Sequence, residues 1–341
     1  MCRKTVLISL ITTAIALATG CNSTEADNGN GNGTEAVTEV VATNLEVPWD
    51  MDFMPGGSII VTERTGAVKV IEEGIPNTAG VIDVAATGEA GLLGIALDPD
   101  FAAIGEVFIY YTYYSGGDMF NRVSKFNLDD SLYGEIVMID SIPASSIHDG
   151  GRLEFGPDGG LYITTGDAAE TWRSGDPDNL GGKILRMNRD GSVPADNPFG
   201  NMVYAKGLRN CEGVDWHNDT MFAVDHGPTR HDEVNIIEMG EDYGWPNTCD
   251  EHPAYRCYTE FTLAPADIAV RDTFIYVSGL RGNQIRKINR ATGDQEAIFT
   301  NYGRIRPLQF HGGYLYFGTS NRDGRGDPAS LDDRIFRTTE Y

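Results

Sequence analysis

A short pattern of apolar and polar positions recurs six times along the chain. Each copy begins with alternating apolar residues, passes through a polar turn and continues into a second alternating stretch. Alternation with a period of two is typical of strands that bury one face, and clusters of Gly, Asp and Asn are typical of turns. The six copies begin at Met51, Ile95, Leu153, Val214, Ile268 and Leu308.

A further strand-like segment follows each copy. Examples are "AVKVIEEG", "GKILRMNRDG" and "NQIRKINRATG", in which apolar residues face one side and mostly polar or charged residues the other. Repeats of roughly 40 to 60 residues, built from strands and turns, are typical of propeller blades. The pattern therefore predicts an all-β fold, a six-bladed β-propeller over residues 39–341. The segment "TEVVATNLEVPW" is expected to supply the closing strand of the last blade.

The N-terminal segment, residues 1–20, indicates an export signal. Two basic residues precede a mostly apolar run that is too short to span a bilayer comfortably. The run ends in "LATGC", which resembles a lipobox and makes Cys21 the expected lipidated residue. The alternative is ordinary cleavage after Ala18-Thr19-Gly20, and both alternatives export the protein. Residues 21–38 are polar and rich in Gly and Asn, which predicts a flexible tether.

The chain is strongly acidic, with a formal net charge of −24. Nucleic acids and anionic membranes need a cationic footprint, so neither is an expected partner. An anionic ligand would need a local group of cations. Arg304 and Arg306 are two positions apart in an expected strand, so their side chains point to one face. Either they pair with acidic residues of the chain, or they clamp a carboxylate or phosphate of a ligand.

Three further features concern the loops and the cysteines. The stretch "DHGPTRHDEVN" combines carboxylates with a Gly-Pro turn, and such oxygen atoms suit Ca²⁺, although Asp and Glu also cap turns. His148 stands alone beside a Gly pair, a setting that favours a hydrogen-bonded structural residue. In an oxidising compartment Cys249 and Cys257 are the expected disulfide, which leaves Cys211 unpaired.

Six motifs, in order, resemble one enzyme family. They are "GEAGLLGIALDPDF", "HDGGRLEFGPDGGLYITTGD", "DNLGGKILRMNRDGSVPADNPF", "GLRNCEGVDW", "DHGPTRHDEVNIIEMGEDYGWP" and "RIRPL". This series is similar to the soluble quinoprotein glucose/sorbosone dehydrogenases, which include PQQ-dependent aldose sugar dehydrogenases. The resemblance implies a six-bladed propeller that transfers a hydride from the anomeric carbon of an aldose to PQQ and releases a lactone. Because the chain has no C-x-x-C-H haem motif, an external electron acceptor is expected.

The resemblance also assigns roles to residues near the reacting groups. It implies that His148 is the base, that Asp167 orients it, and that Glu89 lies on the substrate side. The residues implied in contact with PQQ are Arg209, Asn210, Thr262, Arg281, Arg304 and Arg306, with Arg209 also stabilising the charge that arrives with the hydride. The residues implied at calcium sites are Gly227 and Pro228, and at a second ion Glu233 and Tyr243.

The chain departs from the family pattern at several of these places. Ile147 stands before the base where the glucose enzyme has Asp, Cys211 replaces Pro, and Glu212 and His226 each replace Gln. Sugar specificity therefore does not carry over. Two alternatives remain beside the dehydrogenase: a cofactor-free binding propeller at the cell surface, and a calcium-dependent lactonase. The retained base and arginine pair favour the dehydrogenase.

Overall fold

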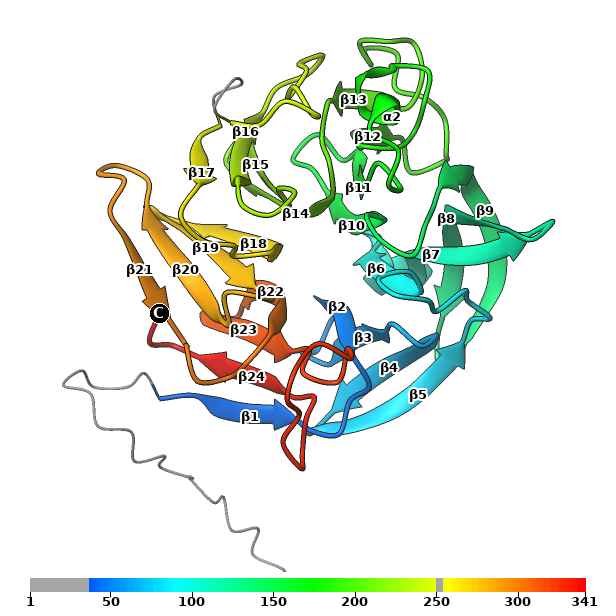
Figure 1. Ribbon diagram of the computed structural model, residues 1–341. Coiled ribbons are helices and arrows are strands. Elements are labelled where there is room, and N and C mark those ends of the chain that lie inside the picture. Colours follow the sequence, from blue (N-terminus) through cyan, green and yellow to red (C-terminus); the bar gives the residue numbers. More distant parts are fainter. Residues whose placement is uncertain (1–36, 250–253) are drawn as a thin grey trace, which may run out of the picture. The chain divides into compact units, whose positions relative to one another are not determined.

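The computed structural model describes residues 37–249 and 254–341. The expected signal segment 1–20, the lipidation site Cys21 and almost all of the tether 21–38 lie outside the described residues. The prediction of a six-bladed β-propeller is confirmed, because six four-stranded antiparallel sheets are arranged around one axis (Figure 1). Within the described residues, no helix is long and apolar enough to cross a membrane.

Each of the first five blades uses four consecutive strands. The first two blades contain β2 (Pro48–Phe53), β3 (Ile59–Glu63), β4 (Ala67–Glu72) and β5 (Ile75–Val81), then β6 (Leu92–Leu97), β7 (Glu106–Ser115), β8 (Asp118–Leu128) and β9 (Leu132–Pro143). The third contains β10 (Gly150–Phe155), β11 (Leu161–Thr165), β12 (Lys183–Met187) and β13 (Val203–Lys206). The fourth contains β14 (Cys211–His217), β15 (Thr220–Asp225), β16 (Asp232–Ile237) and β17 (Arg256–Tyr258). The fifth contains β18 (Pro265–Arg271), β19 (Phe274–Gly279), β20 (Gln284–Asn289) and β21 (Gln295–Ile298).

The sixth blade joins the two ends of the propeller chain. It contains β22 (Ile305–His311), β23 (Tyr314–Thr319), β24 (Ile335–Thr338) and, as its outermost strand, β1 (Glu39–Ala42). The expected closing strand is thus present, and Glu39 lies opposite Arg337 in the pairing. Two short helices, α1 (Phe101–Ile104) and α2 (Trp172–Gly175), complete the described elements.

Apolar side chains of neighbouring blades pack against each other and form the core. One cluster joins Trp49, Leu93, Phe108 and Leu153, which come from β2, β6, β7 and β10. Some outermost strands lack this burial: β5 and β21 are largely exposed, and β17 has only three residues. An exposed edge strand needs no alternation of apolar residues, so the apolar pattern does not reveal these strands.

Carboxylates on the innermost strands connect several neighbouring blades. Asp50 on β2 accepts the backbone N–H of Ile95 at 2.9 Å, and Asp267 on β18 accepts that of Leu308 at 2.8 Å. Arg152, buried on β10, forms ion pairs with both carboxylates. The same guanidinium donates to the backbone carbonyls of the fourth and fifth blades, each at 3.1 Å.

A cavity of about 200 Å³ lies against this ion pair and is rich in carboxyl groups, including Glu154, Asp215 and Asp267. Burial raises the pKa of Asp215 to about 7, although the backbone N–H groups of Val270 and Trp216 act in the opposite direction. Burial also raises the pKa of Glu154, and nearby carboxylates add to the effect. These groups bind protons more tightly in the folded chain than in the unfolded one.

We expect replacement of Asp215 by Asn to change how stability depends on pH. The ordinary pKa of Asp is about 3.9, so this carboxyl favours folding below that pH, and its contribution is lost as pH rises to about 7. Relative to wild type, Asp215→Asn should therefore gain at least about 1 kcal/mol in free energy of unfolding between pH 5 and pH 8.5. Urea unfolding at both pH values measures this, with exposed Asp219→Asn as the matched control. A wild-type-to-variant difference that is independent of pH would contradict the argument.

Candidate active site

The candidate site lies at the end of the propeller where the innermost strands begin. Because neighbouring strands are antiparallel, the second strand of each blade ends there too. The loops 144–149, 166–182, 207–210 and 226–231 therefore meet at one end of the axis. These loops carry most of the residues that the family resemblance singles out.

His148 and Asp167 form a hydrogen-bonded pair. His148 Nδ1 lies 2.7 Å from Asp167 Oδ1, and the carboxylate is almost fully buried. Burial by itself would raise the pKa of Asp167, but the hydrogen bond and charge of His148, with donors from Trp245 and Ala169, lower it overall. An ionised carboxylate only accepts, so Nδ1 of a neutral imidazole carries the proton and Nε2 is the basic nitrogen.

The backbone around this pair adopts uncommon conformations. His148 has φ +62°, and Ala168 and Ala169 have φ +49° and +62°. Positive φ is uncommon for residues other than glycine, and it persists only where the surrounding structure holds the backbone in place. Gly166 packs closely against the loop that carries His148. An added Cβ at this position would collide with the carbonyl oxygen of His148.

Glu89, in the loop between β5 and β6, holds the backbone of His148 by a hydrogen bond. One oxygen accepts the backbone N–H of His148 at 2.9 Å, and the other accepts a guanidinium N–H of Arg325 at 2.9 Å. Burial opposes ionisation, but these donors and the charges of Arg325 and His226 lower the pKa of Glu89 to about 2. Arg325 belongs to "NRDGRG" between β23 and β24, a motif that the sequence interpretation did not use.

The two arginines of the expected clamp are buried and already paired within the chain. Arg306 lies 2.5 Å from Glu212, and Arg304 lies 2.6 Å from Asp323. The pKa of Arg304 is lowered, chiefly by burial and despite the pairing with Asp323. Each arginine thus takes a carboxylate partner, which is one of the two alternatives that the sequence leaves open.

Asn210 and Arg209 connect the base to the rest of the site. Asn210 Oδ1 accepts the backbone N–H of Gly150 at 3.0 Å, and its amide donates to Glu212 at 3.0 Å. Arg209 Nη1 donates to the backbone carbonyls of His226 and Gly227, at 3.1 and 3.0 Å. Among the described residues, Arg209 Nε, Arg306 Nε and His226 Nε2 are buried donors or acceptors that make no hydrogen bond.

The residues expected at the calcium sites line one small cavity of about 10 Å³. Gly227, Pro228, Glu233 and Tyr243 surround it together with Asp225. Burial, with the charge of Asp225, raises the pKa of Glu233 to about 8. Within the ranges 37–249 and 254–341, no group of three or more His, Cys, Asp or Glu side chains is arranged to hold a metal ion.

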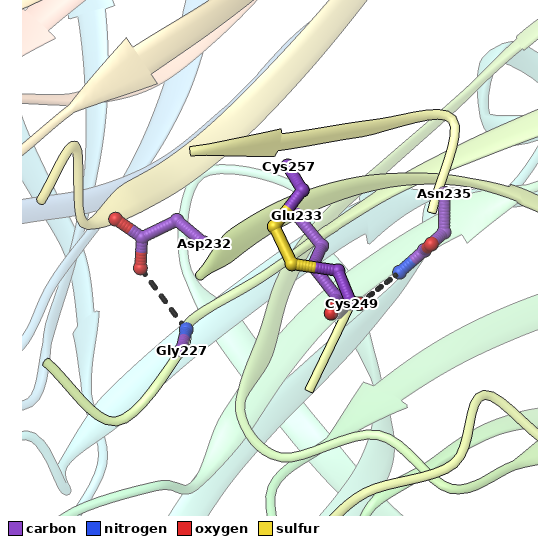
Figure 2. Close-up of a disulfide and its surroundings, with 6 residues drawn as sticks. All are labelled: Gly227, Asp232, Glu233, Asn235, Cys249 and Cys257. Atoms are coloured by element: carbon purple, nitrogen blue, oxygen red, sulfur yellow. Dashed lines mark hydrogen bonds between the residues drawn. A yellow bond between two sulfur atoms is a disulfide. The ribbon is translucent and has the colours of Figure 1, made fainter. Parts of the chain in front are cut away.

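Some of the atoms expected to bind calcium already take part in hydrogen bonds within the chain. The Gly227 carbonyl accepts Arg209, and the Tyr243 hydroxyl donates to the Ile236 carbonyl at 2.7 Å. Figure 2 shows Asp232 accepting the N–H of Gly227 and Asn235 donating to Glu233. The space suits one ion-sized or water-sized particle, and the nearby oxygen atoms suit a hard cation.

The remaining predicted residues lie around this centre. Cys249 and Cys257 form a disulfide beside Glu233 (Figure 2), and Cys211 is buried with a free thiol. The Thr262 hydroxyl donates to the carbonyl of Thr229 in the loop after Pro228. Arg281 is exposed on the loop between β19 and β20.

The chain is similar in sequence to several known dehydrogenases. The family model described as glucose/sorbosone dehydrogenase matches residues 45–259. Aldose sugar dehydrogenase YliI of Escherichia coli is 33% identical over 227 residues, which cover 61% of this chain and 61% of that protein. Quinoprotein glucose dehydrogenase B of Acinetobacter calcoaceticus is 29% identical over 319 residues, which cover 80% of this chain and 63% of that protein. The chain thus spans less than two thirds of the length of these curated relatives.

A solved structure matches the chain more completely. The PQQ-bound form of aldose sugar dehydrogenase from Streptomyces coelicolor has a TM-score of 0.81 and 35% sequence identity. That match covers 89% of this chain and 98% of the other.

We expect Gly166→Ala to disturb the His148–Asp167 pair. The added methyl group would meet the carbonyl of His148 and the amide oxygen of Asn210, so both neighbouring loops must move. Overpacking of this kind lowers the free energy of unfolding by about 1–3 kcal/mol, which urea denaturation measures. Gly175→Ala is the matched control, because this glycine of the same loop has nothing within 4 Å of its added Cβ. Equal stability of the two variants would contradict the crowding at residue 166.

Proposed function

The chain belongs to the glucose/sorbosone dehydrogenase family, and from this we propose that it is an exported PQQ- and calcium-dependent dehydrogenase that oxidises aldose sugars to lactones. The observation that carries the proposal is that the His148–Asp167 pair and the buried arginines Arg304 and Arg306 lie at the same end of the propeller, where β10 and β22 begin. A sugar dehydrogenase needs a base for the anomeric hydroxyl and cationic groups for an anionic quinone. These two sets of residues are proposed to supply them.

The local charges support the binding of PQQ, which carries three carboxylates. Arg304 and Arg306 are buried, and Arg64 lies close enough to Arg306 that this second positive charge, after burial, lowers the pKa of Arg64. The unbonded Nε atoms of Arg209 and Arg306 are further donors among the described residues. Because carboxylates of Glu212 and Asp323 now occupy the arginines, we expect the cofactor to share or displace these partners.

The chain's own residues divide the chemistry between them. His148 Nε2 takes the proton of the anomeric hydroxyl, and Asp167 holds the ring and stabilises its positive charge. Glu89, which accepts the backbone N–H of His148 and pairs with Arg325, is proposed to lie on the substrate side with Arg325. PQQ, when bound, supplies the quinone that accepts a hydride from the anomeric carbon. Arg209 and Asn210 are proposed to face the quinone oxygens, where donors stabilise developing negative charge.

The oxygen atoms around the small cavity are the reason for including calcium in the proposal. The residues Asp225, Gly227, Pro228 and Glu233 provide oxygen atoms around a space of about 10 Å³. A bound ion would keep Glu233 ionised and so reverse the rise in its pKa that burial causes. Because Gly227, Pro228, Glu233 and Tyr243 line the same space, which has room for one ion, we propose a single ion there in place of the two that the resemblance implies.

The location and electron acceptor are proposed from sequence alone. The apolar run and Cys21 support export with a lipid anchor, and the lack of a haem-attachment motif supports a separate acceptor. The lactonase alternative gains no support, because the axial carboxylates Asp50 and Asp267 are paired with Arg152. Nothing in the described residues favours the cofactor-free binding propeller.

The decisive experiment separates cofactor binding from turnover. Calcium-loaded apoprotein is titrated with PQQ by absorbance, then supplied with aldoses and an artificial electron acceptor. We expect stoichiometric binding in wild type and in His148→Ala, and a loss of acceptor reduction of about 10²–10⁴-fold in the variant. His217→Ala, at the opposite end of β14, is the control and should keep full activity. If folded, calcium-replete protein takes up no PQQ, the dehydrogenase proposal is wrong.

A further inference from the structure

Trp245 contacts the candidate site from a loop of the fourth blade that packs against the third blade. Trp245 lies in the connection between β16 and β17, which runs beside β13 of the preceding blade. Lys206 N donates to Glu241 O at 3.0 Å, Tyr243 N to Lys206 O at 2.9 Å, and Trp245 N to Gly207 O at 2.9 Å. This ladder fixes the backbone of Trp245 at the end of the axis where the site lies.

The side chain of Trp245 contacts both halves of the candidate chemistry. Its indole Nε1 donates to Asp167 Oδ2 at 2.8 Å, while Asp167 Oδ1 bonds to His148 at 2.7 Å. On its other side, the ring lies 5.3 Å from the guanidinium carbon of Arg209, a cation–π distance. One side chain therefore connects the base pair to the arginine expected at the quinone.

We propose that Trp245 is a positioning residue: it locks the Asp167 carboxylate in the orientation that leaves His148 Nε2 facing the substrate, and it couples this pair to Arg209. The kinetic part of this inference rests on the proposed dehydrogenase function. The structural part, the indole-to-carboxylate bond, does not.

The physical need for such a lock is specific. The terminal torsion of an Asp side chain is broad, so one hydrogen bond does not fix the plane of the carboxylate. Asp167 receives Ala169 N at 2.8 Å on the oxygen that also faces His148, and Trp245 supplies the donor on the opposite oxygen. An indole N–H donates and never accepts, so it supports only the acceptor state of the carboxylate. The carbonyl of Asp167 is held separately, by Arg173 Nη1 at 3.1 Å.

The kinetic test is a double-mutant cycle with Trp245→Phe and Asp167→Ala. Phe keeps an aromatic ring against Arg209 but loses the N–H, so we expect kcat to fall about 10- to 100-fold, with KM and PQQ stoichiometry nearly unchanged. In the Asp167→Ala background, the same change should alter kcat by less than about threefold, because the residue acts through Asp167. Trp216→Phe is the matched control, since its ring packs 5.1 Å from Tyr162 on blade three, and kcat should stay at the wild-type value.

A spectroscopic test needs neither cofactor nor turnover. The chain has four tryptophans, so ¹⁵N-labelled apoprotein should show four indole N–H resonances, assigned by replacing each tryptophan with Phe. We expect the Trp245 resonance to lie downfield, to exchange slowly with solvent, and to move in Asp167→Ala but not in Asp323→Ala. If Trp245→Phe does not fold, the other three substitutions still assign its resonance by elimination.

The outcomes distinguish the hydrogen bond between Trp245 and Asp167 from the positioning role of Trp245. A Trp245 resonance that Asp167→Ala leaves unmoved overturns the bond and the proposal together. Additive losses of kcat in the cycle overturn the positioning role even if the bond exists. If the resonance moves as expected but PQQ does not bind, the contact stands and the proposed function fails.

Discussion

A single guanidinium on the axis holds the propeller ring together. Arg152 from the third blade pairs with Asp50 of the first and Asp267 of the fifth, and it donates to the backbone of the fourth and fifth. The same two carboxylates accept N–H groups of the second and sixth blades. Arg152 is thus linked to each of the five other blades, either directly or through one carboxylate. Breaking a buried pair by removing one partner typically costs about 3–5 kcal/mol, and a neutral residue in place of Arg152 would leave the carboxylates of Asp50 and Asp267 without this partner.

Two regions of different charge lie on either side of Trp49. Trp49 lies between them, with its ring 4.7 Å from the Arg152 guanidinium and 5.2 Å from that of Arg306. On the Arg306 side, guanidinium groups alternate with Glu89, Glu212 and Asp323. The far cavity holds carboxyl groups whose pKa values burial raises. The guanidinium groups of the site are thus gathered locally and paired with carboxylates, within a chain whose formal net charge is −24.

The sequence predicts what depends on period and order, and it misses what depends on distant contacts. The inner strands were predictable because apolar residues alternate with polar ones, as at β10 and β22, although the structure also buries the polar positions Arg152 and Arg306. The fold of the family and the residues of the base pair followed from motifs. The distant partners did not follow: Arg306 of the clamp and Glu212 are 94 positions apart, Glu89 and Arg325 are 236 apart, and Trp245 is 78 positions from Asp167. Nor does spacing reveal that Arg209 takes the Gly227 carbonyl, since only the folded loops bring them together.

The closure of the sixth blade has a consequence for the order of events during synthesis. Among the described elements β1 comes first and its partner β24 comes last, and the backbone N–H of Val37 donates to the side chain of Glu340 at 2.9 Å. The sixth blade therefore cannot be completed until residues 335–338 have been made. Until then β1 lacks β24, the strand with which it pairs. A chain cut short before residue 335 would leave β1 without that neighbour.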